Sequence, residues 1–563
     1  MEHDKLDTDL DTLKQRAPAW LALNLNARID YLKSMLDGTF EVAEEQVAAA
    51  IEAKRVPAGT AMEAEDYLAG PVVQGRTIRL LIETLEEIRD HGSPRINAGR
   101  IRDVTADQIA VQVIPNDTAD KLLLTGFEGE IWLEPGVNRN NLKDHMGELY
   151  RGGLSDLEPR VALVLGAGNV ASIGPLDVVH KLFVEGQVCL LKMNPVNAYL
   201  GPFIERAFKR LVDDGFLRLA YGGADVGEYL CQHESVDEIH ITGSDRTHDA
   251  IVFGVGEEGA RRKAENDPRN TKRITSELGN VSPVIIMPGS WTEADLRFHA
   301  ENVATQMTNN AGFNCNAAKV LIMHEGWSQK TQFMEMLKSV LAHLPRRAAY
   351  YPGAFERYDR FSTAHSNAIA VGERDETVLP WTLIPDCDSQ NHAEICFTEE
   401  SFCGITAQTT LPGGDAGEFL RNAVAFCNET LWGSLNACII AHPMTEKRYS
   451  DALEEAIRDL EYGSVAINHW PGLCYGMGAT AWGAAPGHTL DDIQSGIGFV
   501  HNTKLFDRPH KTVLRGPFRV FPKPPWFVTH KRSLAVAKRM ASMEHKPSLL
   551  KIPGIAWNAI RGS

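Results

Sequence analysis

Short apolar runs alternate with segments of helical spacing between residues 160 and 309, and this alternation leaves few folds open to the chain. Strands are expected at Arg160–Leu165, Val188–Met193, Leu217–Ala220, Glu238–Thr242 and Val284–Met287, and helices at Pro175–Glu185, Ala198–Asp213, Asp225–Gln232 and Glu293–Asn309. Apolar strands that alternate with helices predict a parallel sheet covered by helices on both faces. The chain is therefore expected to be an α/β protein.

Composition excludes several classes of protein. The N-terminal MEHDKLDTDLD is acidic and has no apolar core, so we expect no signal peptide. The long uncharged span Gly463–Leu490 contains two prolines and many glycines, which argues against a membrane helix. Nine scattered cysteines include no CxxC pair and no His/Cys cluster at zinc spacing, so we expect no metal site and a reducing, cytoplasmic location.

The charge of the chain is unevenly distributed. Residues 511–563 contain eleven Lys or Arg and one acid, Glu544, for a net charge of +10, which leaves −27 for residues 1–510. So acidic a body argues against a nucleic-acid-binding protein. We favour a tail that packs as a strap across the acidic body. A helix over Lys531–His545, with Leu534, Ala537 and Met540 on one side, leaves peripheral membrane contact as the alternative.

The segment Met307–Val320, MTNNAGFNCNAAKV, contains a candidate nucleophile, Cys315. A thiol reacts as a thiolate, which partly exposed, electropositive backbone surroundings favour. Gly312 would let the backbone approach a ligand closely, and Asn309, Asn310 and Asn314 offer uncharged polar contacts. The alternative is a small buried hydrophobic residue, which is what a free cysteine usually is.

Further motifs follow strands or precede turns. Gly166-Ala-Gly168-Asn169-Val-Ala171 matches a dinucleotide fingerprint, but Lys192-Met-Asn-Pro195 replaces the acid expected about 20 residues later. Gly243-Ser244 ends a strand where a helix is expected, which suits a phosphate. The remaining candidates are Glu277, before a glycine turn, and Glu400 with Phe402 in EESF.

The order and approximate spacing of these motifs resemble the aldehyde dehydrogenase superfamily over roughly residues 105–515. The resemblance implies a Rossmann-type cofactor domain, an α/β catalytic domain, a small oligomerisation element, and a homodimer or homotetramer. It also implies NAD or NADP as the cofactor and an aldehyde as the substrate. In that family a cysteine attacks the aldehyde, hydride passes to the nicotinamide, and water hydrolyses the thioester.

Each motif residue takes a role from the resemblance. Cys315 would be the nucleophile, Asn169 the oxyanion donor and Glu277 the general base. The cofactor would be held by Lys192 at the adenosine ribose, by Gly243 and Ser244 at the pyrophosphate, and by Glu400 and Phe402 at the nicotinamide ribose and ring.

Several positions depart from the family pattern and indicate a divergent branch. Val170 and Ala171 replace the usual Phe-Pro after the oxyanion asparagine, Asn280 replaces the second glycine of Glu-Leu-Gly-Gly, and Cys403-Gly404 replaces Gly-Pro. Pro195 stands where an acid often binds the 2′-hydroxyl, so either NAD or NADP is expected. Phe313, Trp470, Tyr475 and Trp482 are expected to line an apolar substrate tunnel.

The domain plan follows from the pattern and the resemblance together. We expect a helical region at 1–104, a dinucleotide-binding domain at 105–275 and a catalytic domain at 276–466. The chain is then expected to return to the cofactor domain, with an oligomerisation element, at 467–515 and to end in a basic extension at 516–563. The dinucleotide-binding domain should begin with strands at Ile109–Ile114 and Glu128–Leu133.

Two alternatives to a hydrolytic dehydrogenase stay open. One is a CoA-acylating relative or acyl-CoA reductase, and the other is a catalytically silent scaffold or membrane-associated protein.

Overall fold

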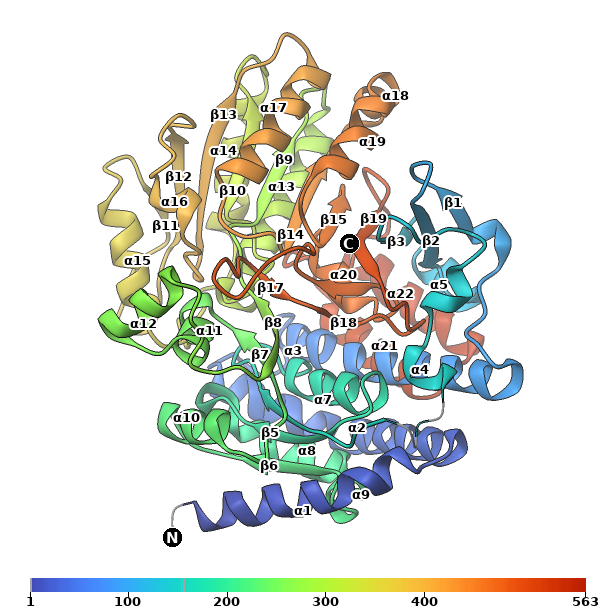
Figure 1. Ribbon diagram of the computed structural model, residues 1–563. Helices are drawn as coiled ribbons and strands as arrows, with labels where there is room; N and C mark the ends of the chain where they lie inside the picture. The colour runs from blue at the N-terminus through green and yellow to red at the C-terminus, as the bar shows by residue number, and fades with distance from the viewer. Residues whose placement is uncertain (1–2, 153, 155–156) are drawn as a thin grey trace.

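Two sheets organise the chain in the computed structural model, which describes residues 3–152, 154 and 157–563 (Figure 1). The smaller has six strands in the order β17 (Gly496–Ile497), β8 (Arg273–Leu278), β7 (Glu238–Gly243), β4 (Val161–Leu165), β5 (Val188–Lys192) and β6 (Leu217–Ala220). All its pairings are parallel except that of β17 with β8. β4, β5 and β7 are buried almost throughout, as expected of strands covered on both faces.

The larger sheet has eleven strands and crosses the upper part of the molecule in Figure 1. Its order is β1 (Ile101–Asp103), β2 (Ile109–Ile114), β3 (Glu128–Leu133), β19 (Pro509–Arg515), β15 (Ser464–Ile467), β14 (Asn436–Ile440), β9 (Pro283–Ile286), β10 (Val320–His324), β13 (Ile405–Leu411), β12 (Trp381–Cys387) and β11 (Ile369–Val371). Helices α13 (Glu293–Thr308), α14 (Lys330–Ala342), α17 (Ala416–Glu429) and α19 (Ser450–Asp459) belong to this part. The predicted α/β class is confirmed.

Two details of the predicted domain plan need correction. The strands at Ile109–Ile114 and Glu128–Leu133 have the expected bounds but lie in the larger sheet, where β3 is antiparallel to β19. The chain also does not return to the smaller sheet at Ile467–Trp470, because β15 pairs with β14 and β19. Among the strands that the structure describes after residue 466, only the short β17 pairs with the smaller sheet. A strand's own pattern of apolar residues does not identify the strand that it will pair with.

A layer of helices from both ends of the chain lies beside the smaller sheet (Figure 1). Its N-terminal part is α1 (Asp4–Leu21), α2 (Leu25–Ala53), α3 (Glu63–Tyr67) and α4 (Val73–His91). α1 is attached to the smaller sheet's layer by its Trp20, whose indole N–H donates to the Leu182 carbonyl at 3.0 Å. The C-terminal part is α21 (Ser533–His545) and α22 (Ile552–Gly562), and α21 packs against α3 and α4.

The basic extension packs on the body of the protein, as the strap interpretation predicted. Arg519 lies 3.2 Å from Asp295, and Lys523 lies 2.6 Å from Glu301. The inward face of α21 differs from the expected one, because its buried apolar residues are Val536, Ala537, Ala541 and Met543. Among the described residues no helix is long and apolar enough to cross a membrane. Contact of the extension with lipid stays a prediction.

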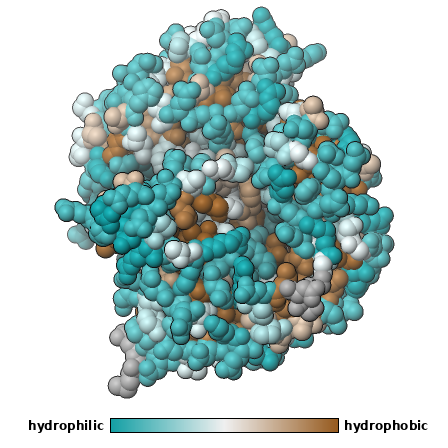
Figure 2. Space-filling model, viewed as in Figure 1, coloured by the Kyte–Doolittle hydropathy of each residue, from teal (hydrophilic) through white to brown (hydrophobic). Residues whose placement is uncertain are grey.

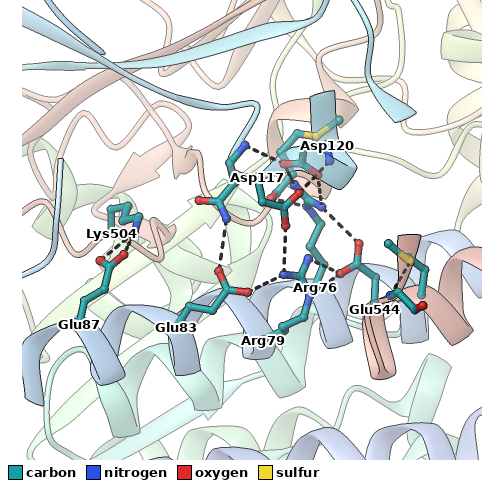
Figure 3. Close-up of polar contacts among 12 residues, drawn as sticks. Arg76, Arg79, Glu83, Glu87, Asp117, Asp120, Lys504 and Glu544 are labelled. Atoms are coloured by element: carbon teal, nitrogen blue, oxygen red, sulfur yellow. Dashed lines mark hydrogen bonds and ion pairs between the residues drawn. The ribbon is translucent and has the colours of Figure 1, made fainter. Parts of the chain in front are cut away.

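The most buried ion pairs of the extension are made by its single acid, Glu544 (Figure 3). Its carboxylate accepts from Arg76 of α4 at 3.2 Å and from Arg79 at 2.7 and 2.9 Å. Arg76 also makes a bidentate pair with Asp120, at 2.8 and 2.9 Å. Arg76, Asp120 and Glu544 are buried, so each charge depends on the others for its solvation.

We expect Glu544→Gln to destabilise the protein substantially. The substitution leaves two buried guanidinium groups short of a negative charge, which typically costs about 3 kcal/mol or more. The matched control is Asp37→Asn. It removes the charge of the exposed Asp37, which lies on α2 and is 2.8 Å from His545, the neighbour of Glu544 on α21. This change should cost less than about 1 kcal/mol. Urea and thermal unfolding of both variants measure the difference, and equal effects would contradict the prediction.

Candidate active site

One cavity brings all eight predicted site residues together. It has a volume of about 640 Å³ and lies along the carboxyl ends of β4, β5, β7 and β8. The order of these strands reverses between β4 and β7, and such a switch point is where open parallel sheets bind ligands. The predicted residues that line the cavity are Asn169, Lys192, Gly243, Ser244, Glu277, Cys315, Glu400 and Phe402.

The loop that carries Cys315 has an unusual backbone. It follows α13, and Asn310, Ala311 and Gly312 have left-handed φ angles of 52°, 58° and 83°. A Cβ atom on Gly312 would lie 2.8 Å from backbone atoms of Cys403 and Gly404. Gly312 therefore allows the loop to pack against another segment of the chain, whereas the sequence analysis expected it to approach a ligand.

Three asparagine side chains hold this loop in place. The Asn310 amide donates to the Asn169 carbonyl at 3.0 Å and to the Asn314 side chain at 3.2 Å. The Asn314 amide donates to the Asn309 side chain at 3.0 Å. These buried, uncharged bonds offset the cost of the left-handed backbone, which is typically about 1–3 kcal/mol per residue.

The Cys315 thiol and the Glu277 carboxyl line the same cavity, and each affects the pKa of the other. All nine cysteines lie in the described part of the chain, and the other eight are buried while Cys315 is partly exposed. Burial, followed by the negative charges of Glu277 and Glu400, holds the pKa of the Cys315 thiol well above its ordinary value. Burial, followed by Asp177, raises the pKa of Glu277 to about 8. A carboxyl group with that pKa can accept a proton near neutral pH.

Asn169 lies where an amide can donate to a ligand beside Cys315. One of its two amide hydrogens goes to the Phe313 carbonyl at 3.0 Å, and an amide nitrogen carries two. The second hydrogen is left for a group bound next to the thiol, because Asn169 lines the cavity together with Cys315. An oxygen that becomes negative at this position could receive a hydrogen bond from Asn169.

The donors and acceptors at the other end of the cavity fit a dinucleotide. Ser244 caps α11 (Asp245–Val252) by accepting from the Thr247 N–H at 3.2 Å, so the start of this helix faces the cavity, as predicted. Burial lowers the pKa of Lys192, which lines the same cavity. Both groups suit the anionic or hydroxyl groups of a nucleotide.

Glu400 is held where a ligand hydroxyl can reach it. A Cβ atom on Gly279 would lie 2.0 Å from its Oε2, so a side chain at position 279 would displace the Glu400 carboxylate. Its Oε1 is buried without a hydrogen-bond partner, and burial raises the pKa of the carboxyl. An unpartnered buried acceptor in a cavity fits the hydroxyl groups of a ribose. Phe402, with a left-handed φ of 40°, lines the same region.

A second cavity, of about 190 Å³, meets the first at Asn169, Glu277 and Cys315. Trp470, Tyr475 and Trp482 line it, as the sequence analysis expected. Phe313 is instead packed against aromatic rings of the core, with its ring centroid 5.0 Å from that of Tyr350. On the face drawn in Figure 2, hydrophobic residues gather in a hollow near the middle, surrounded by hydrophilic residues.

The sequence analysis missed the residues that both ends of the chain contribute to this second cavity. They are Leu68, Val72 and Val73 from the N-terminal helices and Trp526, Met540 and Met543 from the extension. All six lie outside residues 105–515, where the motifs are found. Nothing in their spacing relates them to Cys315.

Comparison with known proteins agrees with this geometry. The model of the aldehyde dehydrogenase family matches residues 173–350. Aminoacetaldehyde dehydrogenase of Pseudomonas aeruginosa is 25% identical over 274 residues, 46% of this chain and 47% of the relative. Coniferyl aldehyde dehydrogenase of a Pseudomonas species is 24% identical over 292 residues, 50% of this chain and 52% of the relative. The matched regions span about a third to a half of the curated relatives.

Solved structures match over most of the chain. NADP-dependent glyceraldehyde-3-phosphate dehydrogenase of Bacillus halodurans, complexed with NADP, covers 91% of both chains at 16% identity and a TM-score of 0.59. An indole-3-acetaldehyde dehydrogenase with NAD⁺ covers 90% of this chain and 87% of its own at 17% identity and a TM-score of 0.57. The predicted fold is confirmed. The chain has the aldehyde dehydrogenase fold, and part of its sequence is distantly similar to members of that superfamily.

We expect alkylation of Cys315 by iodoacetamide to keep accelerating above pH 8. Only the thiolate reacts, and a raised pKa moves its formation to higher pH, so the rate should increase about tenfold per pH unit up to that pKa. Glu277→Gln should shift the profile to lower pH, because the negative charge of Glu277 raises the Cys315 pKa.

Peptide mapping by mass spectrometry gives the rate at Cys315, with N-acetylcysteine in the same buffers as the control for an unperturbed thiol. A rate at Cys315 that levels off below pH 8 would contradict the prediction. So would faster labelling of any of the eight buried cysteines.

Proposed function

We propose that the protein oxidises an apolar aldehyde to a carboxylic acid with NAD or NADP, through a covalent intermediate on Cys315. The observation that carries the proposal is the meeting of the two cavities at Cys315 and Glu277. One cavity is lined by groups that suit a nucleotide, and the other is lined mainly by apolar side chains. An aldehyde carbon that enters from the second cavity would meet the thiol beside the first.

The first step assigned to the chain's own residues is addition of the Cys315 thiolate to the aldehyde carbon. The carbonyl oxygen becomes negative as the carbon–sulfur bond forms. The free amide hydrogen of Asn169 and the backbone N–H of Cys315 are the donors proposed for that oxygen. Each such donor is typically worth about 2.7–4 kcal/mol in the transition state.

The cofactor-binding role is assigned to the far end of the first cavity. Lys192 and Ser244 would bind the adenosine ribose and the pyrophosphate, and Glu400 with Phe402 the nicotinamide ribose and ring. When bound, NAD or NADP supplies the hydride acceptor. Position 195 is a proline at the start of a short 3₁₀ turn, so no carboxylate stands there to exclude a 2′-phosphate. Asp225, whose negative charge raises the pKa of Lys192, is the acid that we consider for exclusion of a 2′-phosphate instead.

Release of the acyl group is assigned to Glu277. Its pKa of about 8 allows it to take a proton from water, which then attacks the thioester carbon. The second candidate is a CoA-acylating enzyme, in which a thiol replaces water. The position of Glu277 beside Cys315 favours water, because transfer to a thiol does not require this base at the nucleophile.

We expect Glu277→Gln to stall the enzyme after hydride transfer. A burst of NADH or NADPH of about one equivalent per active site should survive, and steady turnover should fall by about a hundredfold or more, because water loses its base. Stopped-flow absorbance with an aliphatic aldehyde, with NAD or NADP and with or without CoA, measures both phases.

Cys315→Ala is the matched control for this experiment. It should remove the burst and the turnover while fluorescence titration still shows cofactor binding. Unchanged steady turnover in Glu277→Gln would contradict the role of Glu277. Wild-type turnover that depends strictly on CoA would favour the acylating candidate, and no turnover with any aldehyde would favour a silent scaffold.

The substrate class follows from the second cavity. Its walls are mainly aromatic and aliphatic, which favours a medium or long aliphatic aldehyde or an aromatic one. Part of the wall comes from α21 through Met540 and Met543, and part from Trp526. The extension is therefore proposed to shape the substrate site as well as to stabilise the chain. The sequence analysis had interpreted it only as a strap across the body or as a membrane contact.

We expect Met540→Trp to restrict the protein to aldehydes with shorter alkyl chains. The larger side chain would occupy space that a long alkyl chain needs, so kcat/KM for decanal relative to propanal should fall about tenfold, or roughly 1.4 kcal/mol. Arg539→Ala, on the same helix but away from the cavity, is the matched control and should leave the ratio unchanged. The same ratio in Met540→Trp and wild type would show that the extension does not bound the substrate site.

A further inference from the structure

A group of potential metal ligands lies apart from both cavities. It consists of His365, Cys387, Glu394 and Cys396, and each offers one ligand atom within 4.8 Å of every other. None of the four lines either cavity at Cys315. Imidazole, two thiols and a carboxylate form a donor set that suits zinc. The sequence analysis expected no metal because these residues do not follow a regular spacing, but the fold brings them together.

Three separate segments supply the group. Cys387 ends β12 just after a register shift between Ile384 and Cys387, where Asp386 has a left-handed φ of 54°. Such bulges redirect side chains and often occur beside functional sites. Glu394 and Cys396 lie at the start of the short helix α16 (Ile395–Thr398), and His365 follows α15 (Ala354–Thr363). The site is thus made by tertiary contacts between segments.

The orientation of His365 leaves one ring nitrogen for a cation. Its Nδ1 lies 2.8 Å from the Phe361 carbonyl, which only accepts, so Nδ1 carries a proton. This bond fixes the ring, as a partner on the other nitrogen usually does for a histidine that binds a metal. Nε2 lies 2.9 Å from Glu394 Oε1. A proton on the ring, a proton on the carboxyl or a metal ion must lie between these two atoms, because each is otherwise an acceptor.

The two thiols complete the arrangement. Cys387 and Cys396 are buried with their sulfur atoms within 4.8 Å of each other, whereas His365 and Glu394 keep 11% and 12% of their side chains exposed. An ion can therefore enter from the side of His365 and Glu394. In tetrahedral zinc sites neighbouring ligand atoms are about 3.3–3.8 Å apart, given bonds of about 2.0–2.3 Å. No separation present exceeds 4.8 Å, so none needs to shorten by more than about 1.5 Å.

We propose that His365, Cys387, Glu394 and Cys396 form a structural Zn²⁺ site with one ion per chain. Binding requires no oxidant, since two S–H bonds lose their protons to solvent and two zinc–sulfur bonds form. All four positions of the ion are then filled by the protein, which is typical of a structural site. Cys396 precedes Glu400 by four residues. On the proposed function, the ion would therefore steady the segment that holds the cofactor.

The experiment uses the full-length chain with the Cys315→Ala substitution, so that the partly exposed thiol cannot bind metal. The protein is reduced with a phosphine, freed of metal, dialysed against Zn²⁺ and analysed by mass spectrometry for bound zinc. Co²⁺ replaces Zn²⁺ in a parallel sample, where thiolate-to-cobalt absorption reports cysteine ligands. Cys387→Ser/Cys396→Ser tests the site, and Cys427→Ser, another buried cysteine of the same part of the fold, is the matched control.

We expect one zinc per chain, thiolate-to-cobalt absorption, and a higher midpoint of thermal unfolding with Zn²⁺ than without. All three should be lost in Cys387→Ser/Cys396→Ser and kept in Cys427→Ser. His365→Gln should weaken binding at least about tenfold, the minimum seen when even an outer partner of a ligand is lost. These readouts do not depend on dehydrogenase activity, so failure of the proposed function would leave this test intact.

Three results would overturn the proposal. One is zinc binding that survives in Cys387→Ser/Cys396→Ser. Another is a reduced protein that binds neither zinc nor cobalt, which leaves His365 and Glu394 as an ion pair only. The third is an intact protein two hydrogens lighter than its sequence, with a Cys387–Cys396 disulfide in the peptide map and no metal binding after reduction.

Discussion

The electrostatic interaction between the Cys315 thiol and the Glu277 carboxyl is the one on which the rest of the site depends. Glu277 lies on β8 of the smaller sheet, and residues 279–282 carry the chain directly into β9 of the larger sheet. Cys315 comes from the larger sheet's side. Burial of the pair raises both pKa values, so the thiol and the carboxyl keep their protons near neutral pH until a substrate changes their surroundings.

The crossing between the sheets leaves little freedom for substitution. A side chain at Gly279 would displace the Glu400 carboxylate, which occupies the space where Cβ would be. The Asn280 amide donates to the Asn436 carbonyl at 3.0 Å, and Ser282 donates to Asn280 at 2.8 Å. Asn280 departs from the family pattern, and its buried bonds explain how the crossing accepts a side chain there. Residues 279–282 thus position the proposed base, Glu277, and leave room for the Glu400 side chain.

The sequence analysis selected residues that line one cavity, whereas it assigned two strands to the wrong sheet. Asn169 and Ser244 follow buried parallel strands and Lys192 ends one, and parallel strands bring such positions to one edge whatever the connections between them. The strands at 109–114 and 128–133 had correct bounds but the wrong sheet, because antiparallel pairing with β19 depends on residues almost 400 positions later. Phe313 was misplaced for a related reason: an aromatic next to a nucleophile can face either the substrate or the core.

Net charge predicted that the extension lies on the body of the protein, but it did not predict which residues make the buried contacts. A segment of charge +10 does lie on a body of charge −27, yet its most buried ion pairs are made by its single acid with Arg76 and Arg79. Charge counts describe attraction through solvent, whereas a buried contact depends on which carboxylate and guanidinium groups fit together.

The contact of Glu544 with Arg76 and Arg79 lies beside Met540 and Met543, so the helix that attaches the extension, α21, also bounds the second cavity. The residues proposed for the chemistry lie within 105–515, and part of the substrate wall comes from outside it. Changes in the extension can therefore alter the wall while the Cys315–Glu277 pair stays the same.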